Sequence, residues 1–274
     1  MNKVQERKLL DRYLLDCERR GLSPRTMWSR SHILNKVHKE VGLFHATPDT
    51  LGDWLDRDLK MSSKATYMAT LRAFYEWCVD NDKMDANPVR KMSKLRVPKG
   101  EPHPITPADL KKALANAEPE MKAWLLLGAA GGMRCVEIAG LKVEDIHFDE
   151  PPWLHVGSGK GNKTRNVPLH PDLAQALKSL KMPLQGRAFP RVNAQIVSQR
   201  INRYFDSLGI DSTAHALRHY AATTYWKALG DSGNADILLL TDFLGHSSPS
   251  TSLIYTRRDQ AKGMAAMAHF EVGS

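Results

Sequence analysis

Apolar residues recur at helical spacing through the first 90 residues of the chain. Residues 3–20 present one apolar stripe, and Gly21 follows it as a stop signal. Ser23 and Thr47 are each a capping residue followed by a first-turn proline, which predicts two further helices. A fourth helix is expected to open at Ser63. Four short helices in this length predict a small helical bundle.

The pattern changes in the second half of the chain. Thr106 is another capping residue before a proline, and the apolar run from Met121 to Ala130 predicts a buried helix. Between 143 and 167, short apolar stretches are separated by prolines and a glycine-rich turn. This predicts a three-stranded antiparallel sheet with Lys160 in its second hairpin turn. Further helices are expected at about 171–180, 193–208, 213–229, 234–243 and 249–256. The predicted fold is mainly α, with a mixed α+β second half.

A basic segment that contains proline separates the two halves. Residues 90–104 hold three prolines, which disfavour a helix. The basic residues of this segment are Arg90, Lys91, Lys94, Arg96 and Lys99. They could follow a phosphate backbone, and a solvated tether explains them equally well. We therefore predict a helical domain at 1–92, a linker at 93–104 and a second domain at 105–274.

The net charge of the chain is +9, which favours a polyanionic partner because basic groups that neutralise phosphates release counterions. Lysine and arginine outnumber aspartate and glutamate by 19 to 13 over residues 1–98 and by 20 to 17 over residues 99–274. The N-terminal part is therefore the more basic. A protein that is basic without binding nucleic acid remains the alternative.

The cysteines and the apolar runs indicate in which cellular compartment the protein is expected. Cys17, Cys78 and Cys135 lie far apart and suit a reducing cytoplasm. The N-terminus enters charged sequence at once, without the pattern of a signal peptide. The longest apolar run, from Trp124 to Met133, is too short to span a bilayer. We expect a cytoplasmic protein with no membrane partner.

One predicted helix carries a cluster of chemically active side chains. His215 and Arg218 are three positions apart, so they share a face and could touch the same phosphate. His219, four positions after His215, projects near them. The His-x-x-x-His pair is also compatible with a zinc site. However, no glutamate follows His215, and no third ligand has suitable local spacing. We predict no metal here, and a histidine that only packs or caps is the other alternative.

Five further residues extend this set. His246 follows a Leu-Gly helix stop, and Tyr255 comes nine residues later in a short capped helix. Arg134 follows two glycines, which allow close approach to a ligand, and Glu137 could hold its guanidinium in position. A surface Arg–Glu pair of little energetic weight is the alternative. Lys160 lies between two glycines, in a turn that does not match a P-loop. The tyrosines interpreted as packing residues are Tyr204, Tyr220 and Tyr225.

The order and spacing of these residues resemble the tyrosine recombinase (phage integrase) family over nearly the whole chain. The matching positions are Arg134, the hairpin lysine, His215-x-x-Arg218, Leu244-Gly245-His246 and Tyr255. The resemblance implies that 1–92 is a four-helix, SAM-like core-binding domain and that 105–274 is the catalytic domain. We expect no arm-binding domain of the kind that larger phage integrases carry, so the chain is more similar to simple or Xer-like members.

The resemblance also implies a role for each side chain. Tyr255 attacks the scissile phosphate and leaves a 3′-phosphotyrosine and a free 5′-hydroxyl. The two arginines hold the non-bridging oxygens. The remaining assignments are His215 as acceptor or positioner of the tyrosine proton, Lys160 as proton donor to the 5′-oxygen, His246 as hydrogen-bond partner of the phosphate, and Glu137 as support for Arg134. The residues expected to contact DNA are Arg90, Lys91, Lys94, Arg96, Lys99, Lys163 and Arg165. This chemistry uses no metal, cofactor or ATP.

The function that the resemblance implies is site-specific recombination that integrates or excises a mobile element. The implied partners are double-stranded DNA core or attachment sites, a second subunit on each core site, a homotetramer in the synaptic complex, and an accessory or directionality protein. The implied location is the cytoplasm of a bacterial cell or host, on the nucleoid when bound. Two alternatives stay open: a type IB topoisomerase, and a DNA-binding protein whose site is inactive.

Overall fold

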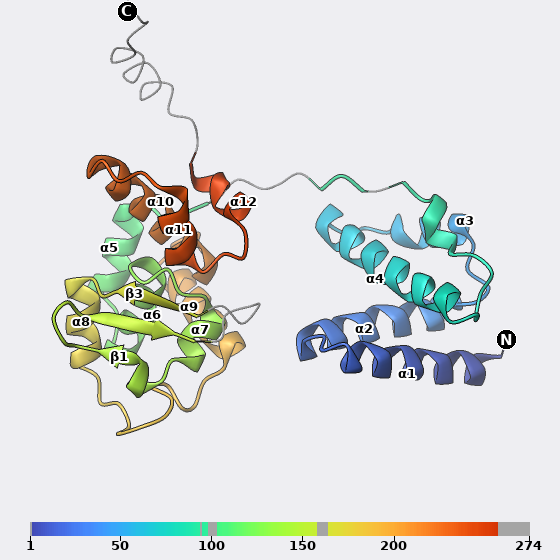
Figure 1. The fold of residues 1–274 in the computed structure, drawn as a ribbon, viewed down its shortest axis with the longest axis horizontal. Helices are drawn as coiled ribbons and strands as arrows, with labels where there is room; N and C mark the ends of the chain where they lie inside the picture. Colours follow the sequence, from blue (N-terminus) through green and yellow to red (C-terminus); the bar gives the residue numbers. More distant parts are fainter. Residues whose placement is uncertain (1, 94, 98–102, 158–163, 257–274) are drawn as a thin grey trace, which may run out of the picture. The chain divides into compact units, whose positions relative to one another are not determined.

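The computed structural model describes residues 2–93, 95–97, 103–157 and 164–256 (Figure 1). The chain divides into two compact units, Met1–Lys99 and Gly100–Ser274, and each has a hydrophobic core of its own. The division lies within residues 93–104. The finer limits 1–92 and 105–274 stay predictions.

The first unit is helical. Its elements are α1 (Lys3–Arg19), α2 (Pro24–Glu40), α3 (Pro48–Leu55), α4 (Met61–Asp80) and the 3-10 turn η1 (Pro88–Lys91). The capping hydroxyls act as expected: Ser23 Oγ accepts from the Thr26 amide and Thr47 Oγ1 from the Thr50 amide, both at 3.2 Å. The core is built from fully buried side chains of all four helices, among them Leu10, Leu34, Leu51 and Phe74.

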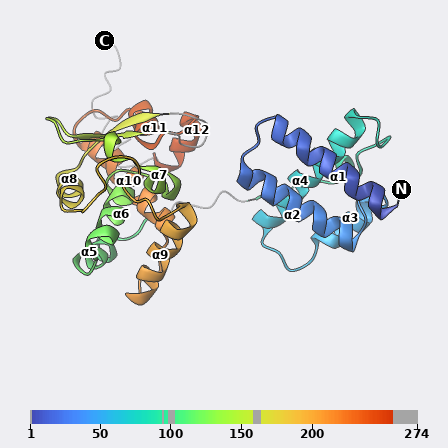
Figure 2. The same ribbon diagram turned by 90° about the horizontal axis from the view of Figure 1, so that it is seen from below.

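The second unit is mostly helical with one small sheet, which confirms the predicted fold class (Figures 1 and 2). Before the sheet come α5 (Pro107–Ala115), α6 (Pro119–Ala129), α7 (Cys135–Gly140) and the 3-10 turn η2 (Val143–Asp145). The strands are β1 (Ile146–His147), β2 (Trp153–Val156) and β3 (Arg165–Pro168). After them come α8 (Pro171–Lys178), α9 (Ala194–Ser207), α10 (Ala214–Asp231), α11 (Ile237–Leu244), α12 (Pro249–Ser252) and the 3-10 turn η3 (Leu253–Tyr255).

Helix α6 is the centre of this unit. It packs against α7, α8, α9 and α10, and residues 123–129 are all buried. The sheet has the order β1-β2-β3, with both pairs antiparallel, and Leu154 lies opposite Ile146 on one side and Val167 on the other. Both views show the sheet on one face of the unit, with α6 and α9 behind it. This arrangement brings the start of β3 close to the end of α11.

The short helix α7 was not predicted. Six residues are too few to show a helical period, and its start is marked by an unusual cap. The backbone amide of Arg134 donates to Glu137 Oε2 at 2.7 Å, and the Arg134 guanidinium donates to Glu137 Oε1 at 2.9 Å. The cap therefore positions two residues of the candidate site at once.

Candidate active site

A buried carboxylate organises the arginines of the site. The Glu137 side chain is fully enclosed and pairs with Arg134 at 2.9 Å and with Arg165 at 3.0 Å. Arg218 lies 3.8 Å from the same carboxylate. Burial by itself would raise the pKa of Glu137, but the hydrogen bonds and charge of Arg165 outweigh it and hold the pKa below its usual value. Glu137 is therefore ionised, and one carboxylate orders three guanidinium groups.

Arg218 is fixed by backbone carbonyls. Its guanidinium donates to the carbonyl oxygens of Gly132 and Leu244, and its side chain is 3% exposed. Gly132 has a φ of +60°, and a Cβ there would lie 3.0 Å from the Phe243 ring, so glycine is required for this approach. Burial and the neighbouring Arg134 lower the pKa of Arg218 to about 9, which still leaves it charged at neutral pH.

Arg165 corrects one expectation. It was predicted to contact DNA, but its side chain is only 5% exposed, and its guanidinium donates to both oxygens of Glu137 and to the Phe243 carbonyl oxygen at 2.8 Å. A guanidinium engaged in this way has few donors left for a phosphate. Gly245, with a φ of +59°, lies against it, because a Cβ there would be 2.8 Å from Arg165 Nη1. Arg165 therefore ties β3 and α7 to the end of α11.

Two histidines and the tyrosine lie beside these arginines. Tyr255, at the end of η3, is 9% exposed, and its hydroxyl lies 2.7 Å from Nδ1 of His219. The rings of His215 and His219 meet edge to face with centroids 4.5 Å apart, and His215 is the exposed one of the pair. Burial raises the pKa of the Tyr255 hydroxyl, while the charges of Arg218 and Arg134 act against that rise. The predicted tyrosine and the arginines are therefore brought into one site.

His246 is oriented by a chain of hydroxyl groups. Its Nδ1 lies 2.8 Å from Ser252 Oγ, which lies 3.0 Å from Thr241 Oγ1. Burial, then the charges of Arg218, Arg134 and Arg165, lower the pKa of His246 to about 4, so the ring is neutral at pH 7. If Ser252 donates to Nδ1, the ring proton sits on Nε2 and can be donated to an anion. Ser252 was not singled out in the sequence, where nothing but its distance of six residues from His246 could suggest the contact.

Ser252→Ala should slow DNA strand cleavage about tenfold, because it removes the hydrogen bond that orients the His246 ring, and leaving a buried polar group unpaired costs on the order of 1–3 kcal/mol. The serine is fully buried. Single-turnover cleavage would measure the effect. Ser250→Ala removes an exposed hydroxyl of the same short helix and should leave the rate unchanged. A wild-type rate for Ser252→Ala would show that Ser252 does not set the orientation of His246.

The other predicted site residues divide into two groups. Lys160 and the DNA-contact candidates Lys94, Lys99 and Lys163 lie outside the described residues. Arg90, Lys91 and Arg96 are exposed in the first unit. Tyr204, Tyr220 and Tyr225 pack against the core of the second unit, as expected. Among the described residues, no group of three or more His, Cys, Asp or Glu side chains could hold a metal ion.

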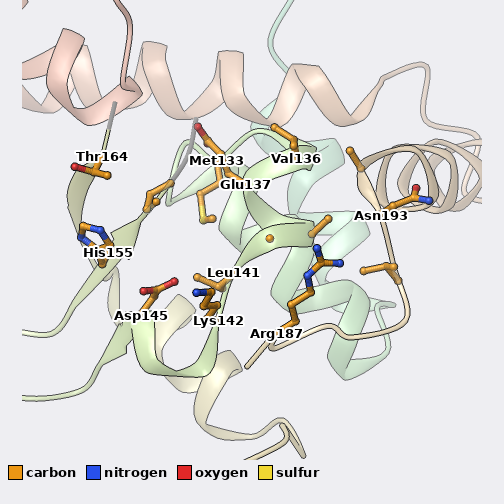
Figure 3. Close-up of a pocket in the computed structure, with 16 residues that line it drawn as sticks. Met133, Val136, Glu137, Leu141, Lys142, Asp145, His155, Thr164, Arg187 and Asn193 are labelled. Atoms are coloured by element: carbon orange, nitrogen blue, oxygen red, sulfur yellow. The ribbon is translucent and has the colours of Figure 1, made fainter. Parts of the chain in front are cut away.

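A cavity of about 710 Å³ is lined in part by Glu137 (Figure 3). Thr164, His155 and Asp145 lie on one side of it, and Arg187 and Asn193 on the other. Of the described site residues, Glu137 is the only one that lines it. Tyr255, His219 and Arg218 are not part of the lining, so the cavity and the tyrosine cluster are separate features.

A tyrosine hydroxyl beside ordered guanidinium and imidazole groups defines a site for phosphodiester chemistry. Residues 104–262 match the model described as the phage integrase family, and the chain belongs to that family. Tyrosine recombinase XerC of Neisseria meningitidis serogroup B is 28% identical over 280 residues, covering 91% of this chain and 90% of that protein. Tyrosine recombinase XerA of Pyrococcus horikoshii is 29% identical over 179 residues, 61% of each chain.

Solved structures show the same fold. A lambda integrase dimer bound to a COC′ core site aligns with a TM-score of 0.75 at 19% identity, covering 93% of this chain and 78% of that one. The Tn1549 transposon integrase in complex with transposon right end DNA aligns with a TM-score of 0.73 at 16% identity, covering 95% and 98%. With its relatives, the chain is a tyrosine-type site-specific recombinase. Within the described ranges, every helix is too short or too polar to cross a bilayer.

Proposed function

We propose that Tyr255 attacks a scissile phosphate of duplex DNA and forms a 3′-phosphotyrosine. The observation that carries the proposal is the position of the Tyr255 hydroxyl. It is hydrogen-bonded to the His219 imidazole, and the charges of Arg218 and Arg134 act to lower its pKa. Guanidinium groups held in place before the reaction can stabilise the charge that develops on the phosphate oxygens. The phosphotyrosine keeps the energy of the broken bond, so strands are rejoined without ATP.

The other roles follow from exposure. The Arg134 side chain is 26% exposed and Arg218 is 3% exposed, so Arg134 presents its free donors outward while Arg218 acts from the floor of the site. His215 is exposed beside them and is placed to contact the phosphate. His246 donates from Nε2. Lys160 is proposed as the general acid for the 5′-oxygen on the strength of the family resemblance.

The proposed partner is double-stranded DNA. The exposed Arg90, Lys91 and Arg96 carry positive charge near the end of the first unit, which holds most of the excess charge. Relatives of known structure include a lambda integrase dimer on a core site and a lambda integrase tetramer on a Holliday junction. We propose the same dimer-to-tetramer assembly here, on the attachment sites of a mobile element, with an accessory protein that sets direction. The proposed location is the bacterial cytoplasm, on the nucleoid when bound.

Cleavage mapping tests this function. Purified protein is incubated, in excess EDTA and without nucleotide, with duplexes tiled across the DNA that flanks its gene. Defined cleavage sites with protein on the 3′ end support recombination. Relaxation of supercoils without defined sites would favour the topoisomerase alternative, and the absence of any covalent adduct would favour an inactive DNA-binding protein. Loss of cleavage on chelation that added metal restores would contradict the mechanism.

Lys160→Ala should cleave normal DNA about 10²–10⁴-fold more slowly, the usual contribution of a general acid. A substrate with sulfur at the bridging 5′ position should restore most of that rate, because a thiolate leaves without a proton. Single-turnover cleavage of both substrates is the measurement, with Lys163→Ala as the matched variant. If the loss in Lys160→Ala is equal on both substrates, Lys160 is not the acid, and Lys163 becomes the better assignment.

A further inference from the structure

The contact between Tyr255 and His219 is the least expected feature of the site. Tyr255 Oη lies 2.7 Å from Nδ1 of His219, with ring centroids 5.7 Å apart. His219 is one helical turn beyond His215 on α10, and the two rings touch. The more exposed His215 therefore has its ring against His219, while His219 meets the hydroxyl. The sequence could only place the two histidines on a shared helix face.

The charge states of the two groups allow the tyrosine to donate this hydrogen bond to the histidine. Burial, followed by the charges of His215, Arg218 and His103, lowers the pKa of His219 to about 4. The imidazole is therefore neutral at pH 7. Burial raises the pKa of Tyr255, so the phenol keeps its proton. In the tautomer with the ring proton on Nε2, Nδ1 of His219 has no hydrogen and accepts, so the tyrosine O–H donates to it.

We propose that His219, rather than His215, accepts the proton of Tyr255 during strand cleavage. This inference rests on the proposed function of Tyr255 as nucleophile. As the tyrosine oxygen bonds to phosphorus, its O–H bond breaks and the proton moves to Nδ1 of His219. The bond from phosphorus to the 5′-oxygen breaks, and that oxygen takes a proton from the general acid. On rejoining, the His219 imidazolium returns the proton to the tyrosine oxygen.

Bound DNA makes His219 a stronger base. Its pKa in the free protein is lowered first by burial, and then by the charges of His215, Arg218 and His103. A phosphate held by the guanidinium groups adds negative charge beside them and offsets the part of that reduction that comes from positive charge. The proton acceptor therefore becomes effective only when the substrate is in place, which protects the free enzyme from carrying a tyrosinate in its site.

The test uses the full chain and the duplex in which cleavage has been mapped. His219→Ala should bind this DNA with unchanged affinity and cleave it about 10²–10⁴-fold more slowly, the usual contribution of a general base. Imidazole added to the buffer should raise the cleavage rate of His219→Ala at least tenfold. Raising the pH should also increase the rate of the variant more steeply than that of the wild type, since tyrosinate then forms without the base. His215→Ala is the matched variant and should keep the wild-type dependence on pH.

A second measurement keeps the test open if His219→Ala folds poorly. Replacing Tyr255 with a fluorinated tyrosine, whose hydroxyl ionises more readily, should rescue His219→Gln and leave Lys160→Ala slow. A wild-type rate and pH profile in His219→Ala would overturn the inference, as would a loss that neither imidazole nor the fluorinated tyrosine changes. If Tyr255→Phe still forms the covalent adduct, the proposed function itself fails, and this outcome is distinct from the others.

Discussion

Tyr255→Phe should bind its DNA site as tightly as the wild type and form no covalent complex with it. The variant removes one oxygen, which is the proposed nucleophile, and keeps the ring that packs at the end of η3. The lost hydrogen bond to His219 costs about 1 kcal/mol of folding free energy, too little to unfold the unit. The measurement is a denaturing gel of protein incubated with labelled duplex, beside a binding titration of the same sample.

The natural control for this experiment is another tyrosine. The rings of Tyr225 and Phe243 stack with their centroids 4.1 Å apart, and Tyr225 packs against the core. Tyr225→Phe should therefore still form the covalent adduct with DNA. A covalent adduct trapped with Tyr255→Phe would remove Tyr255 from the mechanism. Loss of binding together with loss of the adduct would point to a folding defect, and the melting temperature of the variant separates the two results.

Glu137→Ala should destabilise the second unit by about 3–5 kcal/mol, because it leaves buried guanidinium charge without a partner. For a unit of this size the loss corresponds to a fall in melting temperature of roughly 10 °C. Cleavage should be abolished as well, since Arg134 and Arg165 are hydrogen-bonded to this carboxylate and Arg218 loses the negative charge beside it. Thermal unfolding and single-turnover cleavage measure the two effects.

Arg134→Ala separates stability from activity in the same cluster. Its side chain is 26% exposed, so its ion pair with Glu137 is worth no more than about 1 kcal/mol. The melting temperature of Arg134→Ala should therefore be close to that of the wild type. Its cleavage should be lost, because the guanidinium proposed to face the phosphate is gone. If Glu137→Ala and Arg134→Ala melt at the same temperature, the buried carboxylate does not carry the stability assigned to it.

The linear sequence determined most of the helices and strands, and it determined which chemically active side chains the site could use. Periodic apolar positions and Ser-Pro or Thr-Pro caps act within one or two turns, so they predicted most of the helices of both units. Alternating apolar stretches between turn residues predicted the three-stranded sheet. The short helix α7 was missed because its cap is made by an arginine and a glutamate rather than by a common capping side chain.

The tertiary structure decided which of the predicted groups meet. Arg165 lies 28 residues from Glu137 and 78 from Phe243, yet it binds both, and so it supports the site instead of contacting DNA. His219 and Tyr255 are 36 residues apart, and only the packing of α10 against η3 selects His219 over His215 as the partner of the hydroxyl. Spacing along one helix fixes a face to within a turn. The choice between two histidines on that face depends on contacts between distant segments, which the chain makes only when its core is packed.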